Sequence, residues 1–250
     1  MGKNICQLVS VATFFLCYLA LNGLVYAQQK PIELVTGLSK PPFVLEETND
    51  GMQLDLIREA FSLSDINVKF IHMPLGRNIT GFQRWDVEGV ITLPIGYEHP
   101  GMFTSKPYII YQNVAVSLTS SKFNINTLAD LSGKSVAAFQ NAKKFLGEEY
   151  KKTLAYSLDY REVADQSKQI AMLFSRQTEV IILDVNIFRY FMRENRAGMY
   201  NKPFNIHYIF NERPYVAGFK TEAIRDKFDQ GIQALRGNGR YKAILDKYLR

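Results

Sequence analysis

The segment Thr36-Gly37-Leu38-Ser39-Lys40-Pro41-Pro42-Phe43 follows a short apolar run and precedes a helical pattern that begins near Asp55. Two consecutive prolines fix the backbone angle φ and remove two hydrogen-bond donors, so this segment is predicted to be a rigid, non-helical connector. A rigid loop that carries an aromatic residue after a first strand is a candidate wall of a binding cleft. Phe43 is therefore a candidate ligand contact; the alternative is that Phe43 packs in the core.

The pattern on either side of this connector predicts an α/β fold. Residues 32–35 are typical of a short strand, and Leu54, Ile57 and Phe61 recur at the spacing of one helix face. Residues 68–71 indicate a second strand. Strand, helix and strand over this length form a βαβ unit, which predicts a mainly parallel sheet.

A second block repeats this order and opens with a strand at 114–118. The segments 82–91 and 173–182 also share one plan, with an apolar helix residue six positions before a glutamate that opens an apolar strand. This echo favours two similar lobes, although any junction between a helix and a strand can look alike. The second block is predicted to contain strands at 135–139 and 180–183 and helices at 141–150 and 167–174. Strands at 207–210 and 214–219 and two terminal helices ending near Tyr248 follow, and these helices are predicted to pack on the first lobe.

The N-terminus has the pattern of a secretory signal peptide. Lys3 precedes an apolar run over residues 8–24, and Ala27 offers a small residue for cleavage, so residues 1–27 are predicted to be removed. An uncleaved membrane anchor is the alternative. Cys6 and Cys17 both lie within this segment, so the exported chain is expected to fold without disulfides.

The composition is that of an ordinary globular protein, with 47% hydrophobic residues and a formal net charge of +6. The basic residues are spread along the chain without a dense cluster. An exported protein would not meet nucleic acid, so the charge is interpreted as a solvated surface and no nucleic-acid partner is expected.

Short segments spread over nearly all of the mature chain form one ordered pattern: 41–43, 51–55, 106–108, 128–136, 179–184, 214–215 and 239–248. In their order these segments resemble the extracellular solute-binding proteins of family 3, the type that serves polar amino-acid ABC importers. The resemblance implies a two-lobed periplasmic binding protein-like fold of type II. Two mainly parallel sheets flanked by helices would be joined by two crossing strands. Lobe 1 would span residues 28–112 and 213–250, and lobe 2 residues 113–212.

The resemblance also implies a ligand site between the lobes, which would close on the ligand by hinge motion. Phe43 matches the aromatic that packs on the ligand, and Asp184 matches the acidic residue that binds the ligand's ammonium group. The alternative for Asp184 is an internal ion pair, for example with Arg189. Asn141, at the predicted start of a helix, and Thr92, in the predicted strand 89–93, complete this part of the candidate site.

One family feature is missing. No arginine occurs between Trp85 and Arg161, although amino-acid binders of the family carry a carboxylate-binding arginine between the first lobe's last buried strand and the crossing strand. Arg77, at the start of a predicted helix, is the candidate substitute, with an exposed arginine of no special role as the alternative. An ordinary α-amino acid is therefore not the default ligand.

The residues do not suggest an enzyme. His72, His99 and His207 have no metal-ligand spacing, and no nucleophile motif is present. We therefore expect a periplasmic, monomeric, reversible binder of a small molecule, without cofactor or metal, whose partner is an inner-membrane ABC permease. A ligand-sensing module without an importer and a cleft enzyme of the same fold are the alternatives.

Overall fold

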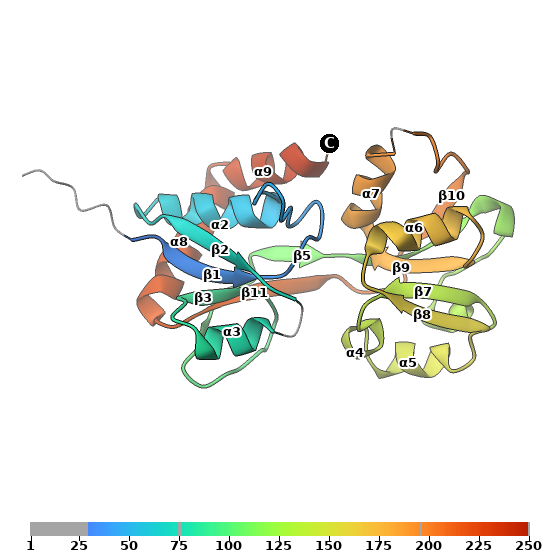
Figure 1. Ribbon diagram of the computed structural model, residues 1–250, viewed down its shortest axis with the longest axis horizontal. Coiled ribbons are helices and arrows are strands. Elements are labelled where there is room, and N and C mark those ends of the chain that lie inside the picture. The colour runs from blue at the N-terminus through green and yellow to red at the C-terminus, as the bar shows by residue number, and fades with distance from the viewer. Residues whose placement is uncertain (1–29, 75–76, 196, 250) are drawn as a thin grey trace, which may run out of the picture. The chain divides into compact units, whose positions relative to one another are not determined.

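The computed structural model describes residues 30–74, 77–195 and 197–249 (Figure 1). The predicted signal peptide at 1–27, with Cys6 and Cys17, lies outside the described residues and stays a prediction. Within the described ranges, no helix has the length and apolar character needed to cross a membrane.

The first sheet has the strand order β2-β1-β3-β11-β4, and β5 also pairs with β11. Its strands are β1 (Ile32–Thr36), β2 (Val68–His72), β3 (Gly89–Pro94), β4 (Phe103–Thr104), β5 (Ile109–Tyr111) and β11 (Arg213–Phe219). The helices that accompany this sheet are α2 (Met52–Ser62), α3 (Asn78–Arg84), α8 (Glu222–Gly237) and α9 (Arg240–Leu249) (Figure 1). The terminal helices α8 and α9 both pack on α2.

The second sheet has the strand order β10-β6-β9-β7-β8. Its strands are β6 (Asn113–Leu118), β7 (Ser135–Phe139), β8 (Asp159–Val163), β9 (Val180–Asp184) and β10 (Phe204–His207). The accompanying helices are α4 (Ala142–Phe145), α5 (Glu148–Leu154), α6 (Gln166–Phe174) and α7 (Val185–Arg193), and short 3-10 turns lie at Thr119–Ser121 and Leu128–Leu131.

Both sheets are mixed rather than mainly parallel. Strands β2-β1-β3 and β8-β7-β9 are parallel, as the βαβ pattern predicts. Strand β11 is antiparallel to β3, β4 and β5, and β6 is antiparallel to β9 and β10. The antiparallel strands adjoin the two crossings between the sheets, where the chain enters one sheet from the other.

Two predicted elements differ from the observed ones. The helix predicted at 141–150 is divided into α4 and α5, because Gly147 adopts a φ of 92° between them. The strand predicted at 207–210 lies earlier, at Phe204–His207, where it pairs with β6.

The echo between segments 82–91 and 173–182 corresponds to one shared structural device. The side chain of Glu88 accepts a hydrogen bond from the backbone N–H of Glu33 at 2.8 Å, and Glu179 accepts one from Ser135 at 2.8 Å. The backbone N–H of Glu88 donates in return to the carbonyl of Glu33 at 2.9 Å. The backbone N–H of Glu179 likewise donates to the carbonyl of Ser135 at 3.2 Å. Each glutamate thus joins the start of one strand to the start of its parallel neighbour.

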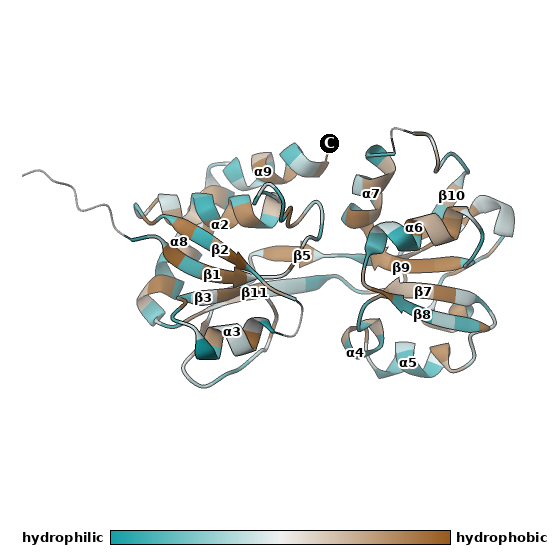
Figure 2. Cartoon of the chain, in the orientation of Figure 1, coloured by the Kyte–Doolittle hydropathy of each residue, from teal (hydrophilic) through white to brown (hydrophobic). Residues whose placement is uncertain are grey.

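The core lies between the sheets and their helices. Figure 2 shows hydrophobic residues concentrated in β1, β2 and β9, while the helices carry both hydrophobic and hydrophilic residues. Leu34, Ile181 and Leu183 in these strands are wholly buried. The helices α2 and α8 come closest at Gly231, where an added Cβ would lie 2.3 Å from the carbonyl oxygen of Ala60.

We expect Gly231→Ala to lower the free energy of unfolding by about 1–3 kcal/mol, because the obstructing atom belongs to a backbone that cannot rotate away. Gly237→Ala is the matched control in the same helix. Gly237 has no atom within 4 Å of an added Cβ, so the change is expected to stabilise by about 0.5–1 kcal/mol. Urea unfolding of both variants checks this prediction, and equal stabilities would contradict it.

Candidate functional site

A cleft with a cavity of about 300 Å³ is lined by residues from both sheets. This volume lies at the lower end for small-molecule sites. The lining residues from the first sheet and its loops are Gly37, Leu38, Ser39, Lys40, Pro74, Thr92, Pro94, Tyr111 and Tyr215. Those from the second sheet and its loops are Asn113, Phe139, Gln140, Phe145, Ala164, Gln166, Asp184 and Ile187.

Tyr111, at the end of β5, lines the cleft, whereas Phe43 does not. Phe43 is 0% exposed and is not part of the lining. Its ring stacks on Tyr111, with centroids 3.8 Å apart and planes 25° from parallel. The structure therefore places Phe43 in the core behind a cleft residue, which is the alternative interpretation of the Pro-Pro-Phe segment.

This placement predicts that Phe43→Ala lowers the free energy of unfolding by about 3–5 kcal/mol, since it opens a cavity in the core. Leu38→Ala, at a residue that also lines the cleft but is 43% exposed, should change the stability by less than about 1 kcal/mol. Denaturant unfolding without ligand measures both. A nearly neutral Phe43→Ala would contradict the core assignment.

A buried polar network lies beneath Tyr111 and Thr92. The Nε2 of Gln53 donates to Thr92 Oγ1 at 2.6 Å and to the hydroxyl of Tyr108, and the Tyr111 hydroxyl donates to Gln53 Oε1 at 3.0 Å. Burial raises the pKa of Tyr111, which keeps its donating proton in place. Thr92 is the predicted site residue of the first sheet that lines the cleft, and its φ of 66° is uncommon for a β-branched residue.

Asp184 lines the cleft at the point where β9 passes directly into α7. One carboxylate oxygen caps the helix by accepting from the backbone N–H of Asn186 at 2.8 Å and of Ile187 at 3.2 Å. The other accepts from the N–H of Gln112 at 2.7 Å. Burial raises the pKa of Asp184 to about 6, against the lowering effect of these three hydrogen bonds and of the charge of Lys40.

The raised pKa of Asp184 predicts a specific pH dependence. Folding buries Asp184 and so disfavours its ionised form, which lowers the free energy of unfolding. This loss is absent below about pH 4, where the carboxyl is protonated in both states. It grows as pH rises to about 6 and then stays constant at about 2–3 kcal/mol. Wild type should therefore lose stability relative to Asp184→Asn as pH rises from 4 to 7. Urea titrations of both proteins at each pH unit measure the difference, and parallel pH profiles would contradict the prediction.

Lys40 is a cleft residue that the sequence did not single out, although it stands in the Pro-Pro-Phe segment. Its Nζ lies 5.4 Å from the centroid of the Tyr111 ring. Burial lowers the pKa of Lys40, and the charge of Asp184 partly offsets that shift. Gln166 was also missed; its Oε1 is buried and, among the described residues, has no hydrogen-bond partner.

Asn141 is exposed and lies outside the cleft lining, beside Gln140, which does line it. Its backbone has a φ of 63° and its side chain does not cap α4. The side chain of Glu162 instead accepts from the backbone N–H groups of Asn141 at 2.7 Å and Lys143 at 3.0 Å. A carboxylate of the protein thus occupies the backbone donors at the start of α4.

Arg77 is exposed, directly before α3, and lies outside the cleft lining. Its backbone N–H donates to the carbonyl of Pro74, a cleft residue. Of the candidate residues, the structure therefore brings Thr92 and Asp184 together in one cleft and leaves Phe43, Arg77 and Asn141 outside its lining.

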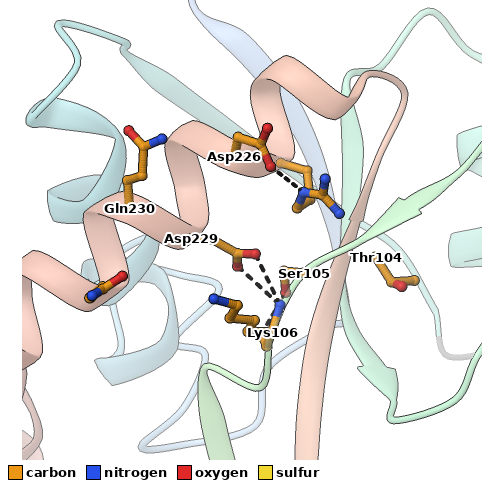
Figure 3. Close-up of a pocket in the computed structure, with 8 residues that line it drawn as sticks. Thr104, Ser105, Lys106, Asp226, Asp229 and Gln230 are labelled. Carbon is orange, nitrogen blue, oxygen red and sulfur yellow. Dashed lines mark hydrogen bonds and ion pairs between the residues drawn. The ribbon is translucent and has the colours of Figure 1, made fainter.

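A second hollow of about 410 Å³ lies between α8 and the segment after β4 (Figure 3). Asp229 points toward Lys106, and its two carboxylate oxygens accept hydrogen bonds from the backbone N–H of Lys106 at 3.0 and 3.3 Å. Asp226 forms an ion pair with Arg225 at 2.6 Å. This hollow is bounded by elements of the first sheet alone. The described residues contain no group of three or more metal-ligating side chains placed to hold an ion.

No protein-family model and no curated protein matches the sequence. Solved structures do match. The GluR0 ligand-binding core in complex with L-glutamate is 17% identical, with 88% of this chain and 99% of that chain covered and a TM-score of 0.72. A substrate-binding protein of an ABC uptake transporter from Streptococcus pneumoniae, with bound histidine, is 15% identical over 87% and 92% of the chains, with a TM-score of 0.69.

A histidine kinase sensor domain with similarity to periplasmic binding proteins is 17% identical, over 89% of this chain and 97% of that chain, with a TM-score of 0.70. The chain has the fold of these proteins. The two-lobed fold predicted from the sequence is confirmed, with mixed sheets in place of mainly parallel ones.

Proposed function

We propose that this protein is a periplasmic solute-binding protein that captures a small polar ligand, an amino acid or a related compound, between two lobes. The observation that carries the proposal is the cleft itself, which is lined from both sheets and contains Asp184. Two similar structures, the GluR0 ligand-binding core and the substrate-binding protein from Streptococcus pneumoniae, contain bound glutamate and bound histidine, which supports an amino-acid-sized ligand. Lobe 1 would comprise residues 28–112 and 213–250, and lobe 2 residues 113–212.

In this proposal the ligand drives closure, because it makes contacts with both lobes only when they approach each other. Asp184 and Thr92 would contact the ligand directly. Phe43 would act through Tyr111, whose ring it supports from behind. The protein would bind and release its ligand without converting it chemically. A product detected by mass spectrometry would instead support a cleft enzyme.

An ABC permease is the proposed partner, and the similarity to an importer's binding protein supports it. The similarity to a sensor domain favours the second candidate, a ligand sensor without an importer. Deletion of the gene separates them: loss of ligand uptake supports transport, whereas intact uptake with a lost response to the ligand supports sensing. The protomer is proposed to act as a monomer.

A thermal-shift screen of amino acids, small organic acids and polyamines tests binding. A ligand at one hundred times its Kd should stabilise the protein by about 2.7 kcal/mol. Ala164→Trp should abolish the shift, because Ala164 lines the cleft and the indole would fill it. Ala155→Trp, at an exposed residue outside the lining, is the matched control and should retain the full shift. Equal shifts in both variants would place the ligand elsewhere.

A further inference from the structure

Lys40 is the cleft residue whose role the proposed function leaves open. Among the described residues that line the cleft, Lys40 carries the only cationic side chain and Asp184 the only anionic one. The two come from different sheets: Lys40 follows β1, and Asp184 ends β9. A ligand that contacts both would therefore bridge the two sheets.

The ammonium group of Lys40 has unused hydrogen-bonding capacity. Within the described part of the chain its Nζ forms no hydrogen bond and no ion pair within 4 Å, and it lies over the aromatic face of Tyr111. An anionic ligand group would form a charge-assisted hydrogen bond with this ammonium group. It would also favour the charged form of Lys40, whose pKa is lowered by burial.

The backbone holds Lys40 in a fixed position. Its N–H donates to the carbonyl of Val44 at 2.8 Å, and its own carbonyl accepts from the N–H groups of Phe43 at 2.9 Å and Val44 at 3.0 Å. These bonds close a turn around the two prolines. The side chain therefore starts from a rigid loop, which reduces the entropy lost when it binds a ligand.

Arg77 and the backbone N–H groups at the start of α4 do not offer a ligand carboxylate a site in the cleft. Arg77 is exposed and lies outside the cleft lining. The backbone N–H groups of Asn141 and Lys143 donate to Glu162. Repulsion from Glu162 would further disfavour an anion at that position.

We propose that Lys40 binds the carboxylate of the ligand through its Nζ and makes the cleft selective for α-amino acids whose ammonium group faces Asp184. This inference rests on the proposed function and names its ligand class. An α-amino acid carries one positive and one negative group, which complement the single anion and single cation of the cleft. A polyamine would meet repulsion from Lys40, and a simple acid would leave Asp184 without a cation from the ligand.

Isothermal titration of paired ligands tests Lys40 directly. The probes are the common L-amino acids and, for each one that binds, its carboxamide, which keeps the ammonium group and loses the negative charge. Wild type should prefer the acid over the amide by at least ten-fold. Lys40→Met should weaken acid binding by at least ten-fold and bind acid and amide within three-fold of each other. Lys40→Arg keeps the charge and should retain the preference.

The outcomes separate the two proposals. If Lys40→Met weakens acid and amide equally, or if it keeps the preference for the acid, the role of Lys40 is wrong while the binding function stands. If polyamines bind and no amino acid does, the role of Lys40 is likewise wrong while the binding function stands. If no amino acid, organic acid or polyamine binds wild type, both proposals fail. Urea unfolding of Lys40→Met and Lys40→Arg confirms that each variant is folded before titration.

Discussion

The hydrogen bonds around Gln112 and Asp184 fix the junction on which the cleft depends. Gln112 stands between β5 and β6, where the chain first crosses from one sheet to the other. Its N–H donates to Asp184, its carbonyl accepts from the N–H of Val185 at 2.9 Å, and its Nε2 donates to the carbonyl of Phe210 at 2.9 Å. Because Phe210 belongs to the second crossing, one residue ties both crossings to the start of α7. The position of Asp184 in the cleft follows from this junction.

Much of the fold could be predicted from the sequence because short-range patterns of apolar residues indicate its strands and helices. The strands β1, β3, β7 and β9 and the helix face of α2 lie where their apolar periodicity indicates. Asp184 was also identifiable, since a carboxylate directly after buried strand residues requires partners. Its partners here are backbone N–H groups rather than Arg189, a finding that needs the tertiary positions of Gln112 and α7.

The candidate site was harder to predict because its residues are defined by contacts between distant segments. Phe43 and Tyr111 are both aromatic and stack on each other, and only the tertiary structure shows that Tyr111 lines the cleft while Phe43 is buried behind it. Asn141 had the residue type of a helix cap, but Glu162, from the end of a neighbouring strand, occupies the donors. The charge of Lys40 points to a role in binding only when the structure shows that Lys40 and Asp184, from different sheets, line the same cleft.

The place of β11 within the first sheet has a consequence for how the chain folds. This strand comes late in the sequence yet lies between β3 and β4, and α8, which follows it, covers α2. The strands of the second sheet, by contrast, all come from one continuous stretch between Asn113 and His207. Closing the long loop from β3 to β11 costs chain entropy before any pairing compensates for it. The second sheet can therefore assemble early, while the first waits for the C-terminal segment, with the edge of β3 unpaired until β11 arrives.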